Sequence, residues 1–297
     1  MRTDGDTWDI ASGVGATALG MAAFRALISE GPDPGIRDDY ARLFVEASDD
    51  PIFTGMLTRD TGRNSPFAGL LGARTRFFDD FFTEAAKSGV RQAVILAAGL
   101  DARAYRLDWL GGTTVFEIDQ PQVLEFKDRV LAAHRAEPMC DRRSVGVDLR
   151  DDWHIALTAA GFDPALPTAW AAEGLVEYLP AATQDLLFHR IDELSAPGSY
   201  FAVNGFPVDA DSSRLVGAES TFYDESGGDN PFGGLDMSEL FYREVRTEPG
   251  QWLTNRGWSV RSTDSLELTI AYGGELPQLP DEVAEVLRKS FYLTASK

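Results

Sequence analysis

Residues 93–101 read AVILAAGLD, an apolar run over 93–97 that closes in a turn at Gly99. A short, continuous apolar run is typical of a parallel strand that is buried on both faces. Glycine at the turn lets the backbone approach a ligand closely. The stretch therefore predicts the first strand of a Rossmann-like sheet, with a ligand at the carboxyl end of the strand.

Similar runs follow at intervals that leave room for helices, at 113–118, 144–147, 168–172 and 200–203. The stretches between them predict helices at 122–136, 153–160 and 180–194. This alternation predicts an α/β fold with a doubly wound, mostly parallel sheet.

The pattern changes on both sides of this alternation. Apolar residues at helical spacing, over 16–28 and 67–86, predict a helical N-terminal portion at 1–90 that packs on a core at 91–297. Residues 206–250 have no clean period and predict an irregular insertion that caps a site. The last quarter predicts β-type runs at 258–261 and 266–272 and a helix at 281–289.

Composition excludes several classes of function. The net charge of −20 repels polyanions, so we expect no nucleic-acid partner. One cysteine and three histidines match no metal-site spacing, so we expect no metal ion, and a single cysteine fits the reducing cytoplasm. The apolar stretch at 10–28 is interrupted by Arg25 and predicts a packed helix, with no membrane span. The sequence says nothing of the oligomeric state.

The ends of the next three strands carry acidic residues. Asp119 follows Gly99 by 20 residues, a separation at which an acid can accept both hydroxyls of a ribose, although an acid can also simply end a strand at solvent. Glu117, on the same strand face, is a weaker candidate for this role. Asp148 could accept an adenine amino proton while Leu149 packs on the ring, or it could cap a helix.

Glu173 ends the fourth strand, where a carboxylate is costly unless a cationic or amino-bearing group pairs with it. No G-x-G-x-x-G follows the first strand, which disfavours a dinucleotide. Three acids and one glycine at successive strand ends suit a ligand with ribose, adenine and positive charge but no phosphate. S-adenosyl-L-methionine has all three features.

The chain also resembles a known family over almost its whole length. RTRFFDDF at 74–81, VILAAGLDARAYRL at 94–107, EIDQP at 117–121, VDLR at 147–150 and AEGL at 172–175 are similar to the actinobacterial branch of the leucine carboxyl methyltransferase family. The resemblance implies a class I methyltransferase fold with a substrate-side cap, and S-adenosyl-L-methionine as the cofactor. It also implies the cofactor-binding residues, which are Arg74, Gly99, Asp119, Asp148, Leu149 and Glu173.

Within this resemblance, Arg74 matches the arginine that holds the cofactor carboxylate, and Glu173 lies close to the methionyl amine. A guanidinium fork suits a carboxylate, but a surface arginine that pairs with Asp79 or Asp80 is the alternative. Arg103, Tyr105 and Arg106 follow the glycine turn, where either one of them faces the pocket or they form a solvated helix start.

Three positions depart from the pattern usual in the family. Glu177 and His154 stand where relatives often carry an apolar residue and a proline, and both are expected to concern the substrate or the surface. The stretch DDYA at 38–41 replaces the commoner Asp-Pro-Tyr-Ala.

The resemblance implies O-methylation of a small molecule, most directly of a carboxylate such as that of a polyketide or another secondary metabolite. A carboxylate is ionised at neutral pH and needs no general base, which fits the lack of an obvious catalytic His or Cys. A phenolic acceptor and a non-catalytic cofactor-binding protein are the alternatives. A short-chain dehydrogenase is disfavoured because its glycine turn and its Tyr-x-x-x-Lys pair are missing. No residue is assigned to catalysis, and the candidates for the acceptor pocket are Tyr178, Asn204, Tyr223, Arg243 and Tyr272.

Overall fold

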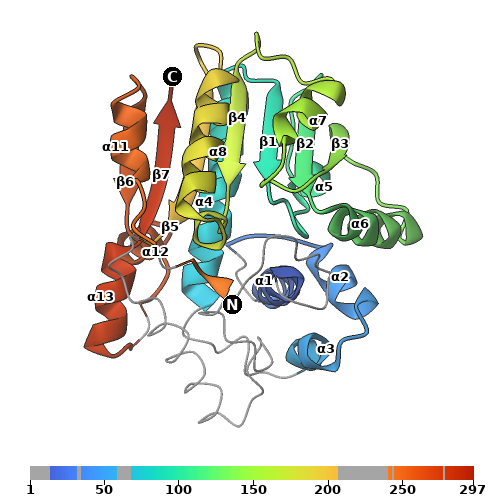
Figure 1. The fold of residues 1–297 in the computed structure, drawn as a ribbon. Coiled ribbons are helices and arrows are strands. Elements are labelled where there is room, and N and C mark those ends of the chain that lie inside the picture. The colour runs from blue at the N-terminus through green and yellow to red at the C-terminus, as the bar shows by residue number, and fades with distance from the viewer. Residues whose placement is uncertain (1–13, 32–34, 59–67, 207–239, 243, 277) are drawn as a thin grey trace.

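The structure is a computed structural model that describes residues 14–31, 35–58, 68–206, 240–242, 244–276 and 278–297. Its strands are β1 (Gln92–Leu96), β2 (Thr114–Asp119), β3 (Asp141–Gly146), β4 (Thr168–Ala172), β5 (Tyr200–Gly205), β6 (Ser259–Thr263) and β7 (Phe291–Ser296). They form one seven-stranded sheet with the order β3-β2-β1-β4-β5-β7-β6 (Figure 1).

The sheet is mostly parallel, as the sequence predicts. β1 to β5 pair parallel with one another, while β7 pairs antiparallel with both β5 and β6. Every residue of β1 and β4 is buried, which fits strands that are covered on both faces. The carboxyl ends of β1, β2 and β4 therefore meet at one edge of the sheet, where ligands of such folds bind.

Helices cover both faces of this sheet. Alternate strand residues such as Ala93 and Ile95 pack with α4 and α6, while Val94 and Leu96 face the side of α7, α8 and α11. These helices are α4 (Ala68–Lys87), α6 (Pro121–Ala133), α7 (Trp153–Ala159), α8 (Ala181–Glu193) and α11 (Pro249–Thr254). The 20-residue α4 places Phe78, Phe81 and Phe82 in the core, as its helical spacing predicts.

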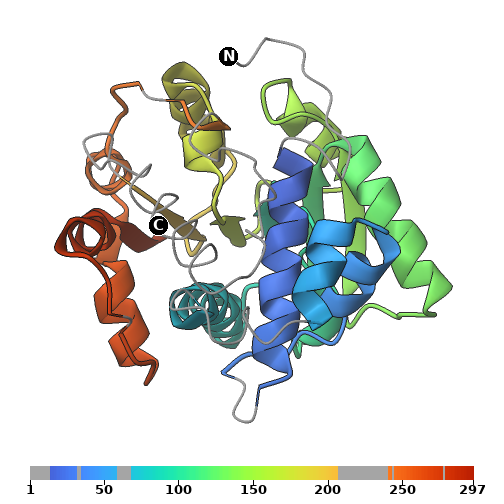
Figure 2. The same ribbon diagram turned by 90° about the horizontal axis from the view of Figure 1, so that it is seen from below.

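Three further helices from the N-terminal part lie at the carboxyl edge of the parallel strands (Figures 1 and 2). They are α1 (Val14–Ser29), α2 (Ala41–Ala47) and α3 (Pro51–Thr58), and α1 contacts α2, α3 and α4. Buried residues of α1, including Leu19 and Phe24, belong to the same apolar cluster as Ala93 and Ile95 of β1. The helical N-terminal portion thus shares a core with the sheet.

The prediction of a β-type run at 266–272 is wrong, because these residues form the helix α12 (Ser265–Ala271). Asp264 caps this helix, since its carboxylate accepts the backbone N–H groups of Leu266 and Glu267. Aspartate is a preferred N-cap residue, and this signal outweighs the apolar run. The helix predicted at 281–289 is confirmed as α13 (Asp281–Lys289).

Two strands differ from their expected form. β3 begins at Asp141 rather than at 144, and only Val145 in it is buried, because β3 is an edge strand and lacks a neighbour on one side. β7 was not predicted as a strand, although it joins β5 to β6.

Most of the predicted cap at 206–250 lies outside the described residues. No helix in the described ranges is long and apolar enough to cross a membrane.

A buried ion cluster fixes β2 to β3 and α6. Glu117 is fully buried, and its Oε2 accepts hydrogen bonds from Lys127 Nζ and Arg142 Nε, each at 2.7 Å. Lys127 is also fully buried. Glu117 therefore has a structural role. These contacts do not support it as a ligand of a ribose, the role for which it was a weaker candidate than Asp119.

We predict that Glu117→Ala lowers the free energy of unfolding by about 3–5 kcal/mol, because it leaves the fully buried Lys127 without its carboxylate and removes one of the two carboxylate partners of Arg142. The midpoint of urea unfolding measures this loss. Asp141→Ala is the matched control, since Asp141 pairs with Arg143 on the exposed edge of the same sheet and such pairs contribute about 0–1 kcal/mol. Equal midpoints for the two variants would contradict the structural role of Glu117.

Candidate functional site

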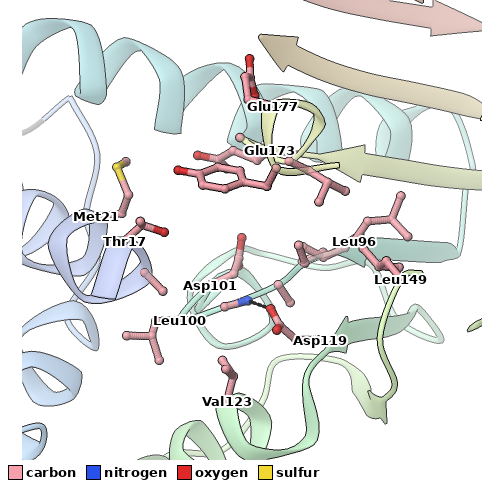
Figure 3. A pocket seen from close by; sticks show the side chains of 18 of the residues that line it. Thr17, Met21, Leu96, Leu100, Asp101, Asp119, Val123, Leu149, Glu173 and Glu177 are labelled. Carbon is pink, nitrogen blue, oxygen red and sulfur yellow. Dashed lines mark hydrogen bonds between the residues drawn. The ribbon is translucent and has the colours of Figure 1, made fainter. Parts of the chain in front are cut away.

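A cavity of about 340 Å³ lies at the carboxyl edge of the sheet (Figure 3). It is enclosed by the ends of β1, β2 and β4, by α1, and by Phe206 and Phe241. Its size suits a small molecule. The cavity brings together all six residues that the sequence assigns to the cofactor, which are Arg74, Gly99, Asp119, Asp148, Leu149 and Glu173.

The turn after β1 has an unusual backbone conformation. Ala97 and Gly99 both have positive φ angles, of 52° and 49°. A non-glycine residue in this region is uncommon and costs conformational energy, which often marks a functional site. A Cβ atom at Gly99 would also lie 3.4 Å from Ala18 Cβ of α1. That distance is an ordinary van der Waals contact, so it is the positive φ that favours glycine at this position, and the backbone N–H of Gly99 points at Asp119.

Asp119 lies at the end of β2 with its carboxylate held by two backbone groups. Oδ2 accepts the Gly99 N–H at 2.6 Å, and Oδ1 accepts the Gln120 N–H at 2.6 Å. Burial raises the pKa of Asp119 to about 6, although these two hydrogen bonds act to lower it. Ligand hydroxyls that donate to this carboxylate would replace part of the hydration it has lost.

Asp148 and Leu149 line the same end of the cavity as Asp119. Gln120 Nε2 donates to Asp148 Oδ2 at 2.5 Å, and the backbone N–H of Arg150 donates to Oδ1 at 2.8 Å. Burial acts to raise the pKa of Asp148, but the contacts with Arg150 and Gln120 outweigh it and lower the pKa. Asp148 is therefore held as a carboxylate, a form that accepts hydrogen bonds.

Arg74 and Glu173 form an ion pair on another wall of the cavity. Arg74 reaches from α4 and donates from Nε to Glu173 Oε1 at 2.9 Å. Gly174 has a φ of 56°, and a Cβ atom there would collide with the Arg74 guanidinium. Arg74 is therefore not a surface arginine that pairs with Asp79 or Asp80, which was the alternative. Together the two side chains offer both signs of charge to one ligand.

A buried arginine holds Glu173 from its other side. Arg103 donates from Nη1 to Glu173 Oε2 at 2.9 Å and from Nε to Asp79 Oδ1 at 2.7 Å. Its Nη1 also binds Asp101, and its Nη2 donates to the Thr75 carbonyl at 3.1 Å. Burial acts to lower the pKa of Arg103, but the carboxylates outweigh it and raise the pKa well above its usual value.

Arg106 joins the same network, since Nη1 and Nη2 donate to the two oxygens of Asp79 at 2.6 Å. The side chains of Arg103 and Arg106 are only 4% and 9% exposed, so the expectation of a solvated helix start at these residues is wrong. Neither of them lines the cavity. The network was not foreseen, although Asp101 and Arg103, two residues apart beside the glycine turn, were a signal for part of it.

α1 supplies a wall that sequence reasoning missed. Thr17 and Met21 face the cavity from successive turns of this helix (Figure 3), and Ala18 also lines it. Arg25 donates to the Leu100 carbonyl at 2.8 Å and to Asp38 Oδ2 at 2.9 Å, which anchors α1 to the glycine turn. Only the helical spacing of these residues was visible in the sequence.

The five candidates for the acceptor pocket have different positions. Tyr178 and Asn204 line the cavity, and Asn204 Oδ1 accepts the Gly174 N–H at 2.8 Å. Tyr272 does not line it, and its ring lies under the Arg76 guanidinium at 4.5 Å. Tyr223 and Arg243 lie outside the described residues. Glu177, noted only as a departure from the family pattern, does line the cavity, whereas His154 does not.

The donor set fits S-adenosyl-L-methionine. Asp119 and Asp148 can accept hydrogen bonds from a nucleoside, and Arg74 with Glu173 complements a group that carries both an ammonium and a carboxylate. Within the described ranges, no group of three or more His, Cys, Asp or Glu residues is arranged to hold a metal ion.

Comparison with known proteins agrees with this assignment. The model of the leucine carboxyl methyltransferase family matches residues 18–192. A Rhodococcus jostii protein named as an S-adenosyl-L-methionine-dependent methyltransferase is 59% identical over all of both chains. A Mycobacteroides abscessus protein with the same kind of name is 52% identical over 99% of this chain and 96% of its own.

Solved structures show the same fold at low sequence identity. A methyltransferase structure from Thermobifida fusca has a TM-score of 0.53 at 16% identity and covers 94% of each chain. A DUF574 family protein from Streptomyces avermitilis has a TM-score of 0.51 at 15% identity, over 93% of this chain and 96% of its own. The chain belongs to the leucine carboxyl methyltransferase family and is an S-adenosyl-L-methionine-dependent methyltransferase.

Proposed function

We propose that this methyltransferase acts on an oxygen of a small molecule, and that the oxygen belongs to a carboxylate. The observation that carries the proposal is the composition of the cavity wall beyond the Arg74–Glu173 pair. That wall is formed by Glu177, Tyr178, Asn204, Phe206 and Phe241, with no histidine or cysteine among them. A carboxylate acceptor is already ionised and needs no such base.

The cofactor, when bound, supplies a methyl group activated by attachment to a positively charged sulfur. In our proposal Asp119 binds the ribose hydroxyls, and Asp148 and Leu149 bind the adenine. Arg74 binds the methionyl carboxylate, and Glu173 binds the methionyl amine.

The remaining task of the protein is to align the two reactants and to exclude water. Leu71 of α4 and Met21 of α1 line the cavity beside the polar residues, and both are apolar. Phe206 and Phe241 surround the acceptor end in the same way. An acceptor with an apolar body and one carboxylate matches such a lining.

A phenolic hydroxyl is the second candidate acceptor, and one observation favours it. Glu177 lines the acceptor end, and a carboxylate there could take the proton that a phenol must lose. The absence of other bases among the described residues of this wall makes Glu177 the residue on which the choice depends.

The test is incubation with methyl-labelled S-adenosyl-L-methionine and matched acceptors. The panel pairs benzoate, 2-naphthoate and octanoate with phenol, 2-naphthol and octanol. We expect base-labile methyl esters from the acids, since esters hydrolyse in mild alkali and aryl ethers do not. Label that appears only in alkali-stable ethers would contradict the carboxylate proposal.

We predict that Asp119→Ala weakens cofactor binding roughly 10- to 100-fold, because hydrogen bonds to a charged acceptor contribute about 1.5–3 kcal/mol. Calorimetric titration with S-adenosyl-L-methionine measures the change. Asp141→Ala is the control, since Asp141 is an exposed acid on the neighbouring strand. A dissociation constant that stays the same in Asp119→Ala would remove Asp119 from the cofactor site.

The pH dependence of cofactor binding gives an independent prediction. Asp119 must be ionised to accept two hydroxyl donors, and burial raises its pKa to about 6 in the ligand-free protein. We therefore expect the dissociation constant to be flat above pH 7 and to rise by up to tenfold per pH unit below pH 6. Asp119→Asn should bind more weakly and lose this dependence. A wild-type constant that does not change between pH 5 and pH 7 would count against the assignment.

A further inference from the structure

Glu177 lies at the boundary between two cavities. It belongs to the short helix η1 (Val176–Tyr178) that follows β4, on the opposite side of the main cavity from Asp119 (Figure 3). A second cavity of about 360 Å³ adjoins it, lined by Gln184, Arg246 and Phe291 among others. Glu177 and Phe206 line both cavities.

The Glu177 side chain is held firmly in this position. Its Oε1 accepts the Phe206 N–H at 2.8 Å, and a Cβ atom at Gly205 would lie only 2.5 Å from the same oxygen. Its backbone carbonyl accepts the Tyr242 N–H at 2.9 Å and Arg246 Nη2 at 3.3 Å. Such contacts fix the carboxyl group at the end of β5, as a binding residue requires.

No cation among the described residues forms an ion pair with Glu177. Arg74 donates to Glu173, and Arg246 donates to the carbonyls of Val176, Glu177 and Tyr242. Burial raises the pKa of Glu177, although backbone hydrogen bonds and the more distant Arg74 and Arg246 act to lower it. The charged and titratable groups around it are Arg74 from α4, Glu173 from the end of β4, Tyr178 from η1, Arg246 before α11, Glu248 at the N-cap of α11 and Tyr292 from β7.

We infer that Glu177 is itself a neutral carboxylic acid when it binds the acceptor. In this form its O–H donates a hydrogen bond to the carboxylate of the acceptor. This inference rests on the proposed carboxylate substrate. Two carboxylates in contact cannot both be ionised in a buried site, so one of them must hold a proton. The acceptor must be the ionised partner, because its oxygen supplies the electron pair for the new bond.

The balance of protons and charge follows from this arrangement. Glu177 takes up one proton from solvent as the acceptor anion binds, and it keeps that proton during transfer. The free acceptor oxygen forms the bond to the methyl carbon as the carbon–sulfur bond breaks, which gives a neutral ester and a neutral thioether. Glu177 returns its proton to solvent when the ester leaves.

The test measures acid binding to the protein loaded with S-adenosylhomocysteine, which cannot transfer a methyl group. Benzoate, 2-naphthoate and octanoate are titrated by calorimetry from pH 6 to pH 8.5, in buffers of different ionisation enthalpy. We expect the wild type to take up as much as one proton per bound acid. Its affinity should fall by up to tenfold per pH unit on the alkaline side.

Glu177→Gln separates donation from proton abstraction, because an amide donates a hydrogen bond but does not titrate, and its carbonyl can still accept the Phe206 N–H. We expect this variant to bind the acids without proton uptake, with an affinity that is constant across the pH range, and to retain methyl transfer. Glu177→Leu should lose acid binding at least tenfold. Glu84→Gln is the control, since Glu84 pairs with Lys87 on the surface of α4.

Several results would overturn the inference. Loss of methyl transfer in Glu177→Gln with acid binding intact would make Glu177 a general base. Unchanged proton uptake in Glu177→Gln would assign the titration to another group, and no binding of any of the three acids to the wild type would also refute it. If esters form but acid binding does not depend on pH, the role of Glu177 is refuted and the carboxylate proposal is not. If only ethers form, both the role of Glu177 and the carboxylate proposal are refuted.

Discussion

The buried guanidinium of Arg103 is the constraint on which the site depends. It is 4% exposed and contacts carboxylates from α4, from the turn after β1 and from the end of β4. A cation taken out of water costs several kcal/mol unless anions and hydrogen-bond acceptors surround it. Arg103 is therefore stable only when α4 and the turn after β1 have come together with the end of β4, which lies 70 residues further along the chain. The cavity forms where they meet.

The same constraint explains how Glu173 can serve a ligand. One of its oxygens accepts from Arg74 and the other from Arg103, so it does not depend on a single partner. If Arg74 turns toward the carboxylate of a bound ligand, Arg103 still balances the charge of Glu173. The pair Arg74–Glu173 can thus separate to bind an ammonium and a carboxylate without leaving a buried charge unpaired. Asp79 and Arg106 extend the support behind it.

The strand-end residues that line the cavity could be located from the sequence. Buried parallel strands are visible as continuous apolar runs, so the positions of Gly99, Asp119 and Glu173 were clear before the fold was known. The edge strand β3 and the helix α12 were harder to predict. β3 is half exposed and has no continuous apolar run, and the start of α12 is determined by its N-cap residue Asp264. Contacts such as Arg25 to Leu100 depend on tertiary packing, which periodicity alone does not specify.

The side chains at the proposed acceptor end of the cavity meet a different chemical requirement. The pattern of strands in the sequence does not reveal it. In the proposed reaction a carboxylate and a sulfonium would lose their charges when the methyl group moves, so groups that stabilise either charge in the ground state would slow it. A free arginine beside the acceptor would bind its carboxylate strongly, but it would hold that charge more tightly before transfer than during it. A neutral carboxylic acid at Glu177 would orient one acceptor oxygen with less loss of reactivity. The described wall, in which Arg74 and Arg246 are already engaged, is consistent with this compromise.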